Sequence, residues 1–187
     1  MRRAWFFCFL VLWKCASFNQ EPGRPPKING VPIADSERYV YIQNFRNNSY
    51  APGLHTKLTQ YVKEEVDRRG RFLQTRDKFK STYRIYGEII HYQLIGNLMD
   101  QVGNQLSSEM FLVTKLEIQK ADTGERLVLE RDEIPGTVYF SPQLGYRESE
   151  EDAQDRLLRV MSIRIAEESE KAWYFFVRSK TQGGEAQ

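Results

Sequence analysis

STYRIYGEIIHYQLIG, residues 81–96, decides the fold because its side chains alternate in character along the whole stretch. Alternation with a period of two is typical of a β-strand that buries one face. One face would carry Tyr83, Ile85, Gly87 and Ile89, and the other Arg84, Tyr86, Glu88, Ile90 and Tyr92. We therefore expect a central strand of about ten residues here.

Three further stretches alternate in the same way and predict the rest of a sheet. RYVYIQNF (38–45) comes before the central strand, and MFLVTKLEIQK (110–120) comes after it. A short turn would join the latter, as a hairpin, to RLVLERDEI (126–134). Pro135 and Gly136 should interrupt that last strand, because proline lacks a backbone N–H and glycine weakens a strand interior. The segment TVYFS (137–141) would resume it.

Two other stretches predict helices, because their apolar residues recur three and four positions apart. The first helix should cover about 53–69, with Gly70 as the residue that ends it. The second should cover about 149–172, beginning at Ser149 with an acidic first turn.

The order strand, helix, three strands, helix predicts an α+β fold: two helices packed on one face of a four-stranded, mostly antiparallel sheet. The other face would then be unusually apolar for a surface in contact with water. Its predicted members are Tyr39, Tyr41, Tyr86, Ile90, Tyr92, Phe111 and Val113. Either this face binds a partner, or a slip of one residue has misassigned some of its members.

The N-terminus has the form of an export signal. Arg2 and Arg3 precede an apolar run from Ala4 to Trp13, which is too short to span a bilayer. Cys15 follows, at the position where bacterial lipoproteins are cleaved and acylated, although Lys14 is atypical of such a cleavage site. We expect a signal peptide over 1–14 and a lipid at Cys15, against the alternative of a signal-peptide cysteine without a role.

Composition narrows the class of protein further. Residues 15–37 are rich in proline and predict a tether, followed by one folded domain over 38–173 and a tail over 174–187. Three of the 27 basic residues lie in the first 14 positions, so the remainder, with 25 acidic residues, is nearly neutral. It therefore has no basic field for nucleic acid.

Catalytic and metal-binding patterns fail when they are placed on these elements. Asp122–Gly124 is the tripeptide of aspartic proteases, but it occurs once, in a predicted turn. Glu88 and His91 are separated by an odd number of positions, which would put them on opposite faces of a strand. His55 lies among polar neighbours on a helix. We therefore expect neither an enzyme, nor a cofactor, nor a metal site.

The ordered set of segments resembles the LPS-assembly lipoprotein family LptE over residues 38–173. The segments are YVYIQNFRNNSYAPGL, LTQYVKEEVDRRGRF, STYRIYGEIIHYQ, LEIQKADTGERLV and GYRESEEDAQDRLLRVMSIRIAEESEKAW. The resemblance implies two helices on a four-stranded sheet, a lipid anchor in the outer membrane, and insertion as a plug into the LptD β-barrel, which delivers lipopolysaccharide to the cell surface. It also implies direct binding of lipopolysaccharide.

These expectations give two hypotheses of function. In the first, a non-catalytic outer-membrane lipoprotein contacts a barrel through Tyr39, Tyr41, Tyr86, Ile90 and Tyr92. Lys78, Lys80 and Arg84 would then meet the phosphates of lipopolysaccharide through charge-assisted hydrogen bonds. In the second, a periplasmic-facing lipoprotein binds a small ligand or peptidoglycan without a barrel, and should have a closed pocket.

Overall fold

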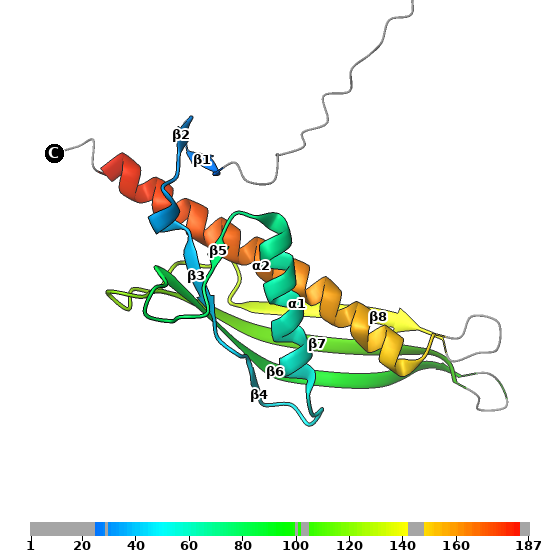
Figure 1. The fold of residues 1–187 in the computed structure, drawn as a ribbon. Coiled ribbons are helices and arrows are strands. Elements are labelled where there is room, and N and C mark those ends of the chain that lie inside the picture. The colour runs from blue at the N-terminus through cyan, green and yellow to red at the C-terminus, as the bar shows by residue number, and fades with distance from the viewer. Residues whose placement is uncertain (1–24, 29, 100, 102–104, 142–147, 184–187) are drawn as a thin grey trace, which may run out of the picture.

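A computed structural model describes residues 25–28, 30–99, 101, 105–141 and 148–183 (Figure 1). Its elements follow one another as β1 (Lys27–Ile28), β2 (Val31–Pro32), the 3-10 helix η1 (Asp35–Glu37), β3 (Tyr39–Ile42), β4 (Arg46–Asn47), α1 (Leu54–Arg69), β5 (Leu73–Gln74), β6 (Tyr83–Met99), β7 (Gln105–Lys120), β8 (Glu133–Phe140) and α2 (Glu150–Gly183). Cys15 and the predicted signal lie outside the described residues.

The main sheet has six strands, in the order β5-β3-β6-β7-β8, with β4 also paired to β6. β3 and β4 run parallel to β6, whereas β6, β7 and β8 form an antiparallel meander. β1 and β2 form a separate two-stranded sheet. The expected four-stranded sheet is therefore wrong, although the α+β class with two α-helices agrees with the described part of the chain. Strands of two residues carry no periodicity, so β1, β2, β4 and β5 left no pattern in the sequence.

β8 lies where the sequence predicted an interruption. The stretch 126–132 forms no regular strand: it makes an isolated bridge between Gln119 and Arg126 and scattered backbone hydrogen bonds to β7, and the strand instead runs through Pro135 and Gly136. Proline is tolerated there because β8 is an edge strand. Glycine fits because a Cβ at position 136 would collide with Met161 Sδ from α2. Gly136, one of the two residues that suggested a break, is thus the residue that lets α2 pack closely on this edge.

The helices cover one face of the sheet (Figure 1). Inward-facing residues of β6, β7 and β8 pack against α1 and α2, and the largest fully buried side chain is Trp173 of α2. Its ring centroid lies 5.0 Å from that of Phe72, and its Nε1 donates a hydrogen bond of 2.9 Å to the carbonyl of Glu37. α2 continues past the predicted end at 172. Within the described residues, no helix combines the length and hydropathy needed to cross a bilayer.

Candidate partner-binding surface

The face of the sheet turned away from the helices carries a row of aromatic and aliphatic side chains. We call it the open face and define it by Tyr39, Tyr41, Tyr86, Phe111, Val113 and Tyr139. Tyr39 is 40% exposed and Tyr139 is 61% exposed, while the others are half-buried between neighbouring strands. Their inward neighbours Val40, Ile85 and Leu112 are buried, as the alternation predicted.

Pairing across the strands brings these side chains together. Tyr41 lies opposite Arg84, and Tyr86 lies opposite Glu117. The ring centroids of His91 and Phe111 are 5.7 Å apart. The open face therefore mixes aromatic rings with charged and polar groups, as is usual for surfaces that bind other proteins.

Tyr92 does not belong to this face, contrary to the prediction. Ile89 pairs with Thr114 and His91 with Val113, so Ile90 is an extra residue at a β-bulge. The bulge reverses the alternation, and Tyr92 is buried on the helix side with 5% exposure. Its hydroxyl accepts a hydrogen bond of 3.2 Å from Gln154 Nε2, and burial raises its pKa. Ile90 itself is half-buried at the bulge.

The same bulge changes the predicted placement of Glu88 and His91 on opposite faces of the strand. Both now belong to the side of the open face, because one inserted residue compensates for their odd separation. Even so, the described residues contain no group of three His, Cys, Asp or Glu side chains that could hold a metal ion. Glu88 accepts a hydrogen bond from Asn48 Nδ2, and Asp122 is paired with Lys120 at 2.7 Å in an exposed turn.

A polar hollow of about 520 Å³ lies along the open face where β3 gives way to β4. Its lining includes Arg46, Glu88, Lys115, Glu117 and Arg126. Arg126 Nε lies 2.9 Å from Glu117 Oε1, so part of the charge is neutralised within the hollow. The hollow is open to solvent on one side rather than closed.

The three basic residues predicted to meet lipopolysaccharide phosphates lie close together. Lys78 and Lys80 belong to an exposed turn over 76–80, and Arg84 Nη2 donates a hydrogen bond of 3.2 Å to the carbonyl of Lys78. Sequence reasoning missed Phe79, which lies between the lysines and is 81% exposed. Lys78 Nζ lies 5.0 Å from the centre of its ring. The turn therefore presents an aromatic side chain flanked by cations.

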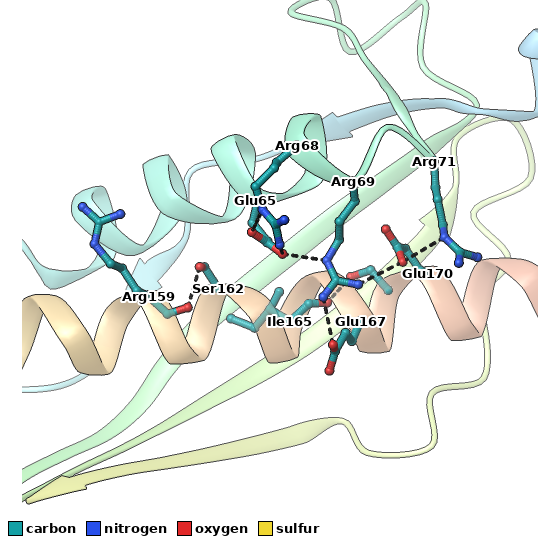
Figure 2. Close-up of polar contacts among 10 residues, drawn as sticks. Glu65, Arg68, Arg69, Arg71, Arg159, Ser162, Ile165, Glu167 and Glu170 are labelled. Carbon is teal, nitrogen blue, oxygen red and sulfur yellow. Dashed lines mark hydrogen bonds and ion pairs between the residues drawn. The ribbon is translucent and has the colours of Figure 1, made fainter. Parts of the chain in front are cut away.

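A charged cluster joins the C-terminal end of α1 to the middle of α2 (Figure 2). Glu65 Oε1 lies 2.6 Å from Arg68 Nη2 and 2.7 Å from Arg69 Nε. Arg69 also contacts α2: its Nη2 lies 2.8 Å from Glu167 Oε1, and its Nη1 lies 3.3 Å from Glu170 Oε2. These contacts hold the two helices in register.

The pKa values of two carboxylates in this cluster are shifted in opposite directions. Hydrogen bonds from Arg68 lower the pKa of Glu65 below its ordinary value, with a smaller contribution from Arg69. Burial raises the pKa of Glu170, although Arg69 and Arg71 oppose the shift. Glu170 Oε1 is buried without a hydrogen-bond partner among the described residues. We interpret the cluster as a structural contact between α1 and α2, since nothing in it is arranged around a space for a ligand.

Comparison with known proteins gives a likeness of fold at low similarity. Neither a known family nor a curated protein matches the sequence. Among solved structures, a minor lipoprotein from Acinetobacter baumannii superposes with a TM-score of 0.46 at 11% identity, over 70% of this chain and 91% of the other.

A hypothetical protein from Chlamydia trachomatis gives a TM-score of 0.47 at 9% identity, over 70% of this chain and 96% of the other. A lipoprotein from Neisseria meningitidis gives 0.43 at 9% identity, over 69% and 98%. Scores and identities at this level assign no activity to the chain.

Proposed function

We propose that this chain is a non-catalytic outer-membrane lipoprotein of the LptE type, which plugs an LptD-like β-barrel and assists its assembly and the insertion of lipopolysaccharide at the cell surface. One observation carries the proposal: the open face leaves an aromatic surface of the sheet without a covering layer among the described residues. A surface that presents aromatic rings among charged and polar groups is typical of a binding site for another protein. The wall of a barrel would supply the missing layer.

Two further features support the proposal. The N-terminal sequence has the form of an export signal followed by Cys15, which would attach the domain to a membrane through the tether over 15–37. The turn that holds Lys78 and Lys80 offers charged donors for the phosphates of lipopolysaccharide, together with Arg84 from the neighbouring strand.

The test is a tagged pull-down from the detergent-solubilised outer membrane of the native host. We expect one large β-barrel protein to be recovered at nearly equal amount. Tyr41→Lys and Tyr86→Lys should each reduce this recovery at least about tenfold, because a lysine in a desolvated contact must bury its charge. Val31→Lys is the matched control, since Val31 is 66% exposed and belongs to the separate two-stranded sheet of β1 and β2. Recovery of the chain alone from intact membranes would overturn the proposal.

The second hypothesis, a lipoprotein that binds a small ligand or peptidoglycan, has one observation in its favour. The hollow beside Arg46 and Glu88 is large enough for a small polar molecule. It lacks the closure that the hypothesis required. If the pull-down returns the chain alone, muropeptide binding by wild-type protein and by Arg46→Ala should be compared by calorimetry, and equal or absent heats would exclude this site.

A further inference from the structure

An exposed turn at one end of the domain combines an aromatic side chain with several cations. We call residues 76–80, RDKFK, the basic turn. All five residues are exposed, and Phe79 is 81% exposed. A single exposed aromatic residue is normal on a protein surface. Two further features distinguish Phe79: the charges around it and its place in the fold.

The basic turn is held in a conformation that leaves its lysines unpaired. Asp77 Oδ1 accepts a hydrogen bond of 2.9 Å from the N–H of Phe79, and the carbonyl of Asp77 accepts one of 3.1 Å from the N–H of Lys80. Arg84 Nη2 donates a hydrogen bond of 3.2 Å to the carbonyl of Lys78. The carboxylate of the turn is thus engaged by the backbone. Among the described residues, neither Lys78 nor Lys80 forms an ion pair.

An exposed ring flanked by unpaired cations is suited to the surface of a membrane. Aromatic rings enter the boundary between headgroups and acyl chains. Lysine side chains lie with their stems along this apolar layer while their ammonium groups reach the phosphates.

The basic turn lies at the end of the domain from which the predicted tether leaves. Thr82 Oγ1, just beyond the turn, donates a hydrogen bond to the carbonyl of Ser36. The N–H of Ile33 bonds the carbonyl of Pro26 at 2.9 Å, which keeps the start of the described chain near this end. That start, residue 25, comes ten positions after Cys15. Ten residues span at most about 35 Å, so a lipid at Cys15 would keep the basic turn close to the membrane.

The other end of α2 carries the opposite charge. Its first turn contains Glu150, Glu151 and Asp152. This turn lies about 35 Å along the helix from Trp173, which contacts η1 at the end that bears the tether. At the tether end, Asp35 is paired with Arg38 at 2.7 Å. An anionic surface would therefore attract the basic turn and repel the far end of α2.

We propose that the basic turn docks the domain on the anionic phospholipid surface of the membrane that holds its N-terminal lipid. Phe79 enters the interface, and Lys78 and Lys80 meet the headgroup phosphates. A contact of this size orients a domain that is already tethered rather than recruiting a free one. The inference rests on the membrane attachment in the proposed function, but not on a barrel partner. Lipopolysaccharide also presents phosphates, so it would compete with phospholipid for the two lysines.

Quenching of tryptophan fluorescence tests the docking in the full chain, carried by its N-terminal segment into vesicles of phosphatidylethanolamine and phosphatidylglycerol. Phe79→Trp places a probe in the basic turn. Tyr50→Trp is the matched control, since Tyr50 is 72% exposed and its ring lies beside Tyr92, away from that turn. Lipids brominated in the upper acyl chain should quench the tryptophan at position 79 at least about threefold more than that at position 50, after subtraction of the wild-type signal.

The contribution of charge is tested in the Phe79→Trp background. Lys78→Glu combined with Lys80→Glu should reduce the quenching at least about twofold, and so should replacement of all phospholipid by phosphatidylcholine. Lys78→Arg combined with Lys80→Arg keeps the charge and should preserve the quenching.

Four outcomes would overturn the proposal. They are equal quenching at positions 79 and 50, quenching that does not depend on the lysines or on anionic lipid, quenching that requires added lipopolysaccharide, and failure of the full chain to associate with vesicles. The vesicles contain no barrel. Docking on them would therefore stand even if the pull-down returned the chain alone, and a recovered barrel would not rescue a turn that fails to dock.

Discussion

The ring of Phe45 occupies the space that a side chain at Gly87 would need: an added Cβ would come within 2.5 Å of Phe45 Cε2. Phe45 is 2% exposed and lies in the segment between β3 and β4. Its backbone N–H donates a hydrogen bond of 3.0 Å to Thr59 Oγ1 of α1, so the ring has little freedom to withdraw. Gly87 is therefore a packing requirement of the central strand.

Gly87→Ala should lower the free energy of unfolding by about 1–3 kcal/mol, as overpacking of a tight core does. Urea denaturation of the purified protein measures this. In the background of Phe45→Leu the same alanine should cost less, because the smaller side chain leaves room. Equal costs in both backgrounds would contradict the close packing of the two residues.

Glu65→Gln should destabilise the protein at neutral pH by about 1.5–3 kcal/mol, the range for a hydrogen bond to a charged group. The pKa of Glu65 is lowered in the folded state, so its stabilising effect is present above the ordinary glutamate pKa and is lost as pH falls through the lowered one. The difference in unfolding free energy between wild type and variant should therefore vanish in acid. A difference that is constant with pH would show that the charge of Glu65 does not contribute.

Glu170→Gln should show the opposite dependence on pH. Because burial raises the pKa of Glu170, its protonated form stabilises the fold below the ordinary pKa, and this contribution is lost as pH rises through the raised one. The unfolding free energy of the variant minus that of wild type should therefore increase as pH rises from acid toward neutral. Thermal melts at a series of pH values can measure both glutamine variants together, and the same trend in both would contradict the assignment.

Substitutions of Tyr92 and Tyr86 should differ in their effect on the free energy of unfolding. Tyr92→Ala should lower the free energy of unfolding by about 3–5 kcal/mol, since it empties a buried aromatic site. Tyr86→Lys should cost no more than about 1 kcal/mol, the range for a cross-strand pair, because Tyr86 is half-buried on the open face. Chemical denaturation ranks the two variants, and a larger loss for Tyr86→Lys would place the wrong residue in the core.

The helices and the buried face of the long strands were predictable from sequence, because each of these elements spans several periods of its hydrophobic pattern. α1 begins and ends within a residue of its predicted bounds, and Gly70 adopts the left-handed conformation expected of the residue that ends it. In β3 and the first half of β6, the alternation placed Val40, Ile85 and Ile89 correctly in the core.

The bulge at Ile90 could not be predicted from the pattern. An inserted residue shifts the alternation by one position, and the apolar sequence IIHY is compatible with either register. The placement of Tyr92 failed for that reason, whereas the predicted positions of Tyr39, Tyr41 and Tyr86 hold because those residues precede the bulge. Phe79 was missed because a single aromatic residue in a polar turn has no period.

The parallel pairing of β3 with β6 fixes an order of events while the chain folds. Val40 of β3 pairs with Tyr83 of β6, so this pairing must close a loop that contains all of α1 and the segment after it. The β6–β7–β8 meander instead joins segments adjacent in sequence, whose loops close at a smaller entropic cost. We expect the meander and α2 to form a nucleus onto which the N-terminal strands dock last. A chain that emerges N-terminus first must keep its earliest strand unpaired until the later ones arrive.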